Sequence, residues 1–344
     1  MLFRSITGSS GENLGAALAF ADVDNDTKYD LIVGSPLSDG AGTDRGKVEV
    51  YSGDTGLLLY SILGSADGDK LGSSVSRVGN IDGSSGEEFI VGIPFADVSA
   101  KTDAGMAKVY KGADGSPFTS ISGNEANARL GSNVSGVGDV DNDGTADFMI
   151  AETHAAAGGT ARGRVRVYSG DDLSVLYVKL GTDDNDHFGA SLAGGADVNN
   201  DGRVDFMIGS PDVDGAGTDR GQVIVYSGVD GSVLYTKTGS ANNDQLGYSI
   251  ALLGNVDGAV GNDFIIGIPG AAGGGSSRGQ TKVFSGDTGN VFYTLNGDED
   301  NGAYGRAVIG LTPGIEADTE DDFAVGAPLV DGAGTDRGKV FVYR

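Results

Sequence analysis

The amino-acid sequence predicts an all-β fold made of six copies of one four-stranded unit. One cassette recurs along the chain: Leu-Gly or Phe-Gly, an acidic loop, an apolar run ending in Gly-x-Pro, a glycine-rich loop, and a run rich in Val and Tyr. Inside it, apolar and polar residues alternate with the period of two that is typical of strands, and no segment has the period of an amphipathic helix. The acidic loop recurs every 58 or 59 residues, and its first position is Asp22, Asn80, Asp139, Asp197, Asn255 or Gly314.

The four strands of each copy can be placed from the apolar runs and the turns between them. In KVEVYSG, from Lys47 to Gly53, β-branched and aromatic residues precede the turn-forming SGDTG, which predicts a third strand. The strands of the first copy are expected at about 14–20, 30–34, 46–52 and 57–63. Those of the third copy are expected near 130–136, 147–151, 163–169 and 174–180.

The two ends of the chain distinguish a closed ring of sheets from an open stack. The chain begins with LFRSITG (Leu2 to Gly8), which matches fourth strands such as LLYSILG at Leu58, and it ends with KVFVYR, a third strand. A ring in which residues 1–10 complete the last blade explains both ends, whereas an open solenoid needs capping repeats. The small residues Ala16, Ala17 and Ala19 suit a first strand beside a central channel. We therefore predict a six-bladed β-propeller of four-stranded antiparallel blades.

We expect one propeller domain over residues 1–344. The predicted blades are blade 1 at about 14–63, blade 2 at about 71–123, blade 3 at about 130–181, blade 4 at about 188–239, blade 5 at about 246–297 and blade 6 at about 304–344.

Charge and composition exclude several classes of function. The chain carries 23 Lys and Arg against 49 Asp and Glu, a formal charge of −26, so phosphate and anionic lipid would repel it. Cysteine is absent and only His154 and His187 are histidines, which leaves no thiolate metal site and few histidine ones. No apolar run approaches the roughly 20 residues of a membrane helix, and the first residues lack the apolar segment of a signal peptide. We expect no nucleic-acid binding and no direct membrane insertion.

The acidic loops have the ligand pattern of a calcium site. In DVDNDTKYD, Asp22, Asp24, Asp26 and Asp30 stand at positions 1, 3, 5 and 9, and Lys28 at position 7 can contribute its backbone carbonyl. Ca²⁺ takes six to eight hard oxygens at about 2.3–2.6 Å in a tolerant geometry, whereas Mg²⁺ prefers fewer carboxylates and more water. The alternative is a set of solvated acidic turns, in which the like charges would repel one another without a cation.

Three of the six loops carry the fullest set of oxygen ligands, and we expect Ca²⁺ at these three and at up to six. The first three are Asp22, Asp24, Asp26, Lys28 and Asp30; Asp139, Asp141, Asp143, Thr145 and Asp147; and Asp197, Asn199, Asp201, Arg203 and Asp205, with Lys28, Thr145 and Arg203 binding through their backbone carbonyls. The weaker sets are Asn80, Asp82, Ser84 and Glu88; Glu316, Asp318 and Asp322; and Asn255, Asp257 and Asp263.

These residues resemble the FG-GAP repeat, the blade unit of the integrin α-subunit propeller and of many bacterial surface proteins. The FG position reads Leu14/Gly15, Leu71/Gly72, Leu130/Gly131, Phe188/Gly189, Leu246/Gly247 and Tyr304/Gly305, and the GAP position begins at Gly34, Gly92, Gly209, Gly267 and Gly326. The resemblance implies calcium loops on one face and ligand-binding loops on the other. The chain departs from integrins in having six blades instead of seven, and its third copy has Ala151, Glu152 and Thr153 in place of Gly-x-Pro.

Two sets of repeated residues have both a functional and a structural interpretation. An arginine precedes the glycine of the third strand in five copies: Arg45, Arg162, Arg220, Arg278 and Arg337. These could hold an anionic ligand, but we favour pairing with nearby carboxylates such as Asp44, Asp219 or Asp336. One aromatic position recurs in all third strands: Tyr51, Tyr110, Tyr168, Tyr226, Phe284 and Tyr343. It could stack sugars, but we favour packing between blades.

The repetition favours a binding protein over an enzyme, because near-identical copies build a platform whereas catalysis needs one asymmetric set of residues. We predict a non-catalytic, calcium-binding propeller that serves as a rigid protein-binding or cell-adhesion module, extracellular or at the cell surface. Its ligand, a protein or a glycan, would bind on the face opposite the calcium loops. One alternative is a lectin-like carbohydrate-binding propeller. A further one is an enzyme such as a polysaccharide lyase or phosphodiesterase, for which Glu152 and His154 are the residues to test.

Overall fold

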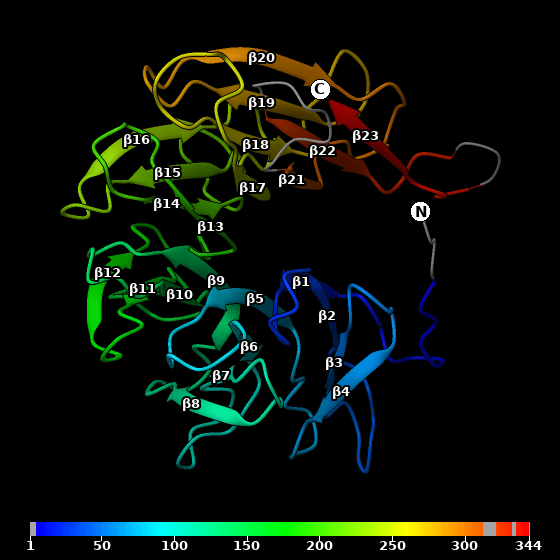
Figure 1. Cartoon of the computed structure of the whole chain (residues 1–344). Coiled ribbons are helices and arrows are strands. Elements are labelled where there is room, and N and C mark those ends of the chain that lie inside the picture. Colours follow the sequence, from blue (N-terminus) through cyan, green and yellow to red (C-terminus); the bar gives the residue numbers. More distant parts are fainter. Residues whose placement is uncertain (1–4, 312–320, 332–334, 344) are drawn as a thin grey trace. The chain divides into compact units, whose positions relative to one another are not determined.

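The computed structural model describes residues 5–311, 321–331 and 335–343, and every regular element within them is a β-strand (Figure 1). The strands form six antiparallel sheets in sequence order, five with four strands and one with three. The chain is therefore an all-β, six-bladed propeller, as predicted. Among the described residues no helix occurs that could cross a membrane.

The blades divide between two compact units, Met1–Gly138 with Asp143–Leu180, and Asp139–Asn142 with Gly181–Arg344. Blade 1 has β1 (Ala17–Ala21), β2 (Asp30–Ser35), β3 (Lys47–Tyr51) and β4 (Leu58–Leu63). Blade 2 has β5 (Ser74–Gly79), β6 (Glu88–Ile93), β7 (Met106–Tyr110) and β8 (Pro117–Ser122). Blade 3 has β9 (Leu130–Gly138), β10 (Asp147–Glu152), β11 (Arg164–Tyr168) and β12 (Val175–Leu180).

The second unit holds the other three blades. Blade 4 has β13 (Ser191–Ala196), β14 (Asp205–Ser210), β15 (Gln222–Tyr226) and β16 (Val233–Thr238). Blade 5 has β17 (Ser249–Leu252), β18 (Phe264–Ile268), β19 (Gln280–Phe284) and β20 (Val291–Asn296). Blade 6 has β21 (Ala307–Leu311), β22 (Asp322–Ala327) and β23 (Lys339–Tyr343).

The predicted closure by the N-terminal strand is not tested. Residues 1–4 lie outside the described part of the chain, and residues 5–10 form no strand. The single-domain boundary likewise stays a prediction.

The core of each unit lies between neighbouring blades, and the recurring aromatic position contributes to it. The third-strand aromatic ring stacks on a phenylalanine of the second strand in blades 2 to 6, with centroid separations of 4.9–5.8 Å. In blade 1 the facing residue of Tyr51 is Leu31. Such a stack contributes roughly 0.5–1.5 kcal/mol beyond the burial of its area. Tyr110, Tyr168 and Phe284 also lie in buried clusters that include residues of the preceding blade, so packing between blades, the favoured interpretation of this position, is confirmed in blades 2, 3 and 5.

The two glycine motifs meet where one blade packs on the next. A Cβ atom at Gly92, the first residue of Gly-x-Pro in blade 2, would lie 2.0 Å from the carbonyl oxygen of Gly131 in the Leu-Gly of blade 3. The first-strand Ser74 donates a hydrogen bond of 3.0 Å to the same oxygen. The equivalent glycine pairs are Gly34 with Gly72, Gly209 with Gly247 and Gly267 with Gly305, at 2.2, 2.6 and 2.0 Å. The repeated motif is thus a main-chain joint between blades.

We expect Gly92→Ala to lower the free energy of unfolding by about 1–3 kcal/mol, because its methyl group would overpack this joint. Gly326→Ala is the matched control: it alters the same motif position in blade 6, where the nearest described atom to an added Cβ is the Ala307 Cβ at 3.4 Å. Urea unfolding of both variants measures the difference. Equal losses of stability would contradict the steric account of the motif.

Candidate metal centres

The acidic loop of blade 1, between β1 and β2, is closed by its first carboxylate. Asp22 accepts the backbone N–H groups of Asp26 at 3.0 Å and Thr27 at 2.9 Å. Asp22, Asp24 and Asp30 each offer one oxygen, and these three atoms lie within 4.8 Å of one another. Three hard oxygens around one point are the start of a calcium coordination shell.

The loops of blades 3 and 4 have related arrangements. Asp139, Asp141 and Asp147 also bring one oxygen each within 4.8 Å of the others. In blade 4, Asp197 accepts the N–H groups of Asp201 at 3.1 Å and Gly202 at 2.8 Å, as Asp22 does in blade 1. The position-3 side chain is an amide there, and Asn199 Nδ2 donates to Asp201 at 2.8 Å. The predicted ligands of blade 4 therefore share the loop but are partly bonded to each other.

Position 9 of the loop has a second role that the sequence pattern did not reveal. Its carboxylate is fully buried in five blades: Asp30, Glu88, Asp147, Asp205 and Asp263. Asp30 accepts the N–H of Val23 in its own loop and the N–H of Gly53 in the β3–β4 turn, both at 2.9 Å. This residue clamps two segments together as well as facing the other loop carboxylates.

The electrostatics of these loops favour a bound cation. Burial and then the neighbouring Asp30, Asp26 and Asp22 raise the pKa of Asp24. In blade 4, burial raises the pKa of Asp205 to about 6, against three backbone N–H donors that lower it. A divalent cation would relieve both the repulsion and the burial cost. The carboxylate oxygens of blades 1 and 3 thus fit Ca²⁺, while the metal site of blade 4 and the carbonyl ligands at Lys28, Thr145 and Arg203 remain predictions.

The weaker loops differ from this arrangement in their first residue. In blades 2 and 5 the first position is an asparagine, and its amide donates to the carbonyl of position 5, from Asn80 to Ser84 at 2.6 Å and from Asn255 to Ala259. Asp82 and Asp257 accept a backbone N–H from residues 84 and 259 at 2.7 Å. In blade 6, Glu316 and Asp318 lie outside the described residues, and Asp322 is buried at the start of β22.

The recurring arginines form ion pairs, but with a different partner from the one predicted. Arg45 Nε lies 2.6 Å from the Asp67 carboxylate, and Arg278 Nε lies 2.5 Å from Asp300. The prediction of Asp44 as the partner of Arg45 is wrong. Asp44 sits in a left-handed turn with φ of 48°, where its N–H bonds to Asp39. Arg45 and Arg278 instead reach the loop that follows the fourth strand of their own blade.

The third copy, which breaks the Gly-x-Pro rule, contains a buried ion pair. Glu152 is fully buried and is bonded to Arg164, with Nε at 3.1 Å, and to Arg166. His154 lies beside it, with Nε2 2.9 Å from Arg129 Nη1 and Nδ1 3.0 Å from the Thr153 hydroxyl. Both carboxylate oxygens of Glu152 are taken by arginines, which is the environment of a structural ion pair and not of a catalytic acid.

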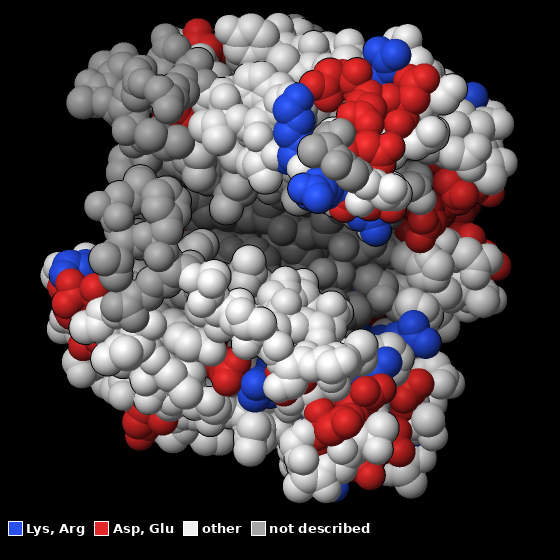
Figure 2. Space-filling view, turned by 90° about the vertical axis from the view of Figure 1, so that its right-hand side faces the viewer, with Lys and Arg blue, Asp and Glu red and all other residues white. Residues whose placement is uncertain are grey.

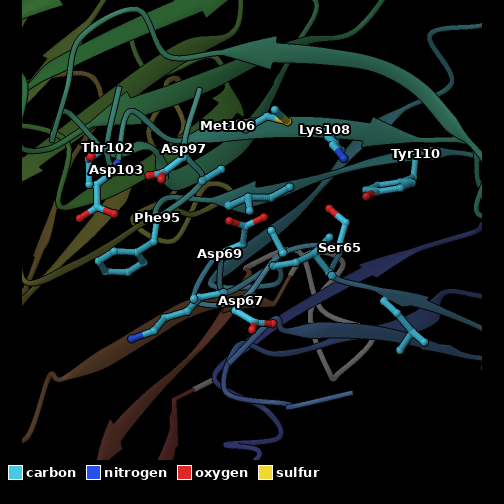
Figure 3. A pocket seen from close by; sticks show the side chains of 18 residues that line it. Ser65, Asp67, Asp69, Phe95, Asp97, Thr102, Asp103, Met106, Lys108 and Tyr110 are labelled. Carbon is cyan, nitrogen blue, oxygen red and sulfur yellow. Dashed lines mark hydrogen bonds between the residues drawn. The ribbon is translucent and has the colours of Figure 1, made fainter. Parts of the chain in front are cut away.

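A crevice lies on the face opposite the acidic loops, between the loop after β4 and the loop after β6 (Figure 3). Its volume is about 630 Å³, and Met106, Lys108 and Tyr110 of β7 contribute one wall. Figure 3 shows the Asp69 carboxylate near its centre, with Asp97 to one side and Lys108 to the other. The crevice thus combines acidic, basic and apolar groups.

Phe95, at one end of the crevice, is already covered by cations. Lys70 Nζ lies 4.8 Å and the Arg129 guanidinium 4.9 Å from its ring centroid. The ring therefore stabilises two loop cations and contributes less apolar surface to a ligand.

The acidic side chains gather in patches on the face seen in Figure 2, with lysines and arginines beside them. The described chain contains local pairs of opposite charge, such as Lys28 with Asp54 and Lys339 with Asp298.

The FG-GAP repeat family matches residues 14–51 and 188–226, which lie in blades 1 and 4. Integrin alpha-5 of Xenopus laevis is 33% identical over 163 residues, covering 45% of this chain and 15% of that protein. Integrin alpha-V of Gallus gallus is 26% identical over 226 residues, covering 62% of this chain and 21% of that protein. Phosphatidylinositol-glycan-specific phospholipase D of Rattus norvegicus is 30% identical over 226 residues, covering 57% and 26%. The chain thus spans about a quarter or less of these relatives.

Two solved structures share the fold. Sqt1 of Saccharomyces cerevisiae has a TM-score of 0.58 at 12% identity, with 95% of this chain and 72% of that chain covered. BBS1N in complex with ARL6DN has a TM-score of 0.54 at 10% identity, with 91% and 73% covered. At these identities the likeness concerns the fold alone.

Two carboxylates of the crevice should affect the pH dependence of stability with opposite signs. Burial and the neighbouring Asp97 raise the pKa of Asp69, whereas the hydrogen bond from Arg45 lowers the pKa of Asp67. A raised carboxyl pKa costs stability above that pKa, and a lowered one contributes stability above the unfolded value of 3.8. At pH 7, Asp69→Asn should therefore stabilise the protein, by less than about 1 kcal/mol since water screens the group. Asp67→Asn should destabilise it.

Melting curves from pH 3 to 8 measure both effects. The difference in stability between each variant and the unsubstituted protein should shrink as the pH falls below the ordinary aspartate pKa, because the carboxylates are then protonated. Stabilities that differ by the same amount at pH 3 and pH 7 would show that charge is not the cause.

Proposed function

We propose that this chain, which is an integrin-like FG-GAP repeat β-propeller, serves as a calcium-binding, non-catalytic module that binds a protein partner. The observation that carries the proposal is the pair of acidic loops, in blades 1 and 3, in which three carboxylates bring oxygens within 4.8 Å of one another. Repetition of this loop on one end of each blade leaves the opposite face for a ligand.

Calcium would be held by Asp22, Asp24, Asp26 and Asp30 in blade 1 and by the corresponding residues of blades 3 and 4. The ion would supply positive charge and fix the loop. Asp22 already organises the loop backbone through its two N–H contacts, and Asp30 joins the loop to the β3–β4 turn. A prearranged loop loses little conformational entropy when the ion binds, which favours binding.

The opposite face would bind the partner, and the crevice beside β7 is the part of it best suited to a ligand. Its size falls within the usual range of ligand pockets, and it offers charges of both signs next to the apolar Met106. Mixed charges of this kind suit a polypeptide segment, which carries its own charged and apolar side chains. A glycan is the second candidate, because carboxylates and Lys108 can also bond hydroxyl groups.

The proposal of a non-catalytic role rests on the surroundings of Glu152, in the third copy, which departs from the repeated motif. Glu152 is engaged by Arg164 and Arg166, so both of its carboxylate oxygens are occupied by ion pairs within the chain. One relative is a phospholipase D by name, but this chain covers only 26% of it, so that activity is not transferred to the chain.

We place the module outside the cell or at the cell surface. Extracellular calcium, at about millimolar concentration, would saturate even loops of modest affinity. The integrin relatives support this placement through their family, not through any signal in the described residues.

Calcium should raise the melting temperature by several degrees relative to a chelator-treated sample, because an ion at 100 times its Kd contributes about 2.7 kcal/mol per site. Asp24→Asn should reduce this gain, since it removes one ligand of the blade 1 loop. Asp114→Asn, which removes the same charge from an exposed turn, is the control and should leave the gain unchanged. Differential scanning calorimetry in EDTA and in millimolar Ca²⁺ measures all three. A melting temperature that calcium does not alter would contradict calcium binding.

Partner binding can be tested at the crevice with a pair of equivalent lysines. Lys108 lines the crevice on β7, and Lys282 holds the same strand position on β19 of blade 5. Against a panel of purified secreted and cell-surface proteins and a glycan array, Lys108→Glu should weaken binding at least tenfold, whereas Lys282→Glu should not. Equal effects would exclude the crevice, and binding to glycans alone would favour the lectin-like alternative.

A further inference from the structure

We propose that the ammonium group of Lys111 takes, in blade 2, the place of the metal ion in the other acidic loops. The blade 2 loop is then closed by a cation that belongs to the chain, and it binds no calcium. This inference rests on the proposed calcium binding of blades 1, 3 and 4, and it corrects the expectation that Asn80, Asp82, Ser84 and Glu88 form a weaker metal site.

Lys111 stands at the position after the third strand, which is a serine in four of the six blades and Arg344 in the sequence of the sixth. The four serines are Ser52, Ser169, Ser227 and Ser285. This position faces the acidic loop, because the Ser227 hydroxyl in blade 4 lies 3.5 Å from Asp201 Oδ2. A lysine here directs a much longer and charged side chain at the same carboxylates.

The ammonium meets the carboxylate that a metal would use. Lys111 Nζ lies 2.9 Å from Asp82 Oδ2. Asp82 holds position 3, the position of Asp24 in the blade 1 cluster. Its side chain is only 3% exposed, and this oxygen accepts no hydrogen bond of good geometry from elsewhere in the described chain. A buried carboxylate oxygen needs a cation or a donor, and Lys111 supplies the cation.

The charge balance of the two loops differs accordingly. Asp82 Oδ2 faces an ammonium group of the chain, whereas the nearest oxygens of Asp22, Asp24 and Asp30 lie within 4.8 Å of one another. Asp82, Asp114 and Glu88 in turn stabilise the charged form of Lys111. The ammonium of Lys111 thus offsets one of the two loop carboxylates of blade 2, whereas the blade 1 loop has four carboxylates.

The first position of the loop is also unsuited to a metal. Asn80 Oδ1 accepts the N–H of Gly83 at 2.9 Å, and Nδ2 donates to the Ser84 carbonyl. Two carboxylates remain, Asp82 and Glu88, where blade 1 has four. Asn255 of blade 5 makes the same two contacts within its own loop, although blade 5 has Ser285 where blade 2 has Lys111. The asparagine arrangement therefore does not depend on the lysine. The two substitutions can therefore be separated by experiment.

Counting bound Ca²⁺ by native mass spectrometry on the full chain tests the inference. Asn80→Asp alone restores the missing carboxylate but retains Lys111, and it should bind the same number of ions as the unsubstituted protein. Asn80→Asp combined with Lys111→Ser restores both features of blade 1 and should bind one ion more. Asp82→Asn in the unsubstituted protein should not reduce the count, whereas Asp24→Asn should.

Three results would overturn the inference: an extra ion with Asn80→Asp alone, no extra ion in the double variant, or the loss of an ion with Asp82→Asn. A folding defect is recognised by melting in EDTA. The double variant should melt lower than the unsubstituted protein there, since its buried carboxylates lack a cation, and calcium should restore it. If the unsubstituted protein binds no calcium while the double variant binds one ion, the proposed function fails and the inference about Lys111 stands.

Discussion

The buried carboxylate at the ninth position of each loop is the contact on which the rest of the blade depends. A carboxylate removed from water is costly unless it is bonded on all sides, and here backbone N–H groups from two separate segments supply those bonds. Asp205, for example, accepts from Val198 at 2.8 Å and from Gly228 at 2.9 Å, so one side chain fixes both the start of the acidic loop and the β15–β16 turn. The turn approaches so closely that a Cβ at Gly228 would lie 2.0 Å from the Val204 carbonyl oxygen. These contacts within the chain hold the start of the loop and the turn together.

The blades share the same fold but differ in the cation that balances the charge of their loop carboxylates. Where three carboxylates converge, as Asp22, Asp24 and Asp30 do in blade 1, an external divalent ion is the natural counter-charge. Where asparagine and lysine replace two of the participants, as in blade 2, the chain supplies its own counter-charge through Lys111. The contact with the loop is the same in both, because Glu88 accepts the N–H of Ile81 at 2.8 Å as Asp30 accepts that of Val23. If the proposed calcium binding holds, metal dependence is a property of single loops and not of the fold.

Much of this architecture could be predicted from the sequence, because it follows from local patterns that repeat. Strand positions such as β2 at Asp30–Ser35 and β12 at Val175–Leu180 agree with the predicted segments to within a residue or two. What local patterns could not predict were contacts between segments far apart in the chain. Arg45 meets Asp67, 22 residues away, and not its neighbour Asp44. Lys111 reaches Asp82 across 29 positions, and the spacing within either motif carries no sign of it, although the replacement of a repeated serine by lysine was visible.

The glycine joints have a consequence for how such a chain can change over evolutionary time. Because neighbouring blades touch through main-chain atoms at Gly34 and Gly72 or at Gly267 and Gly305, the spacing between blades is set without any particular side chain. The lysine at position 111, where four other blades have serine, lies outside these glycine contacts. The contacts that hold neighbouring blades together are thereby separate from the side chains of the acidic loops. Each loop can therefore change in sequence on its own.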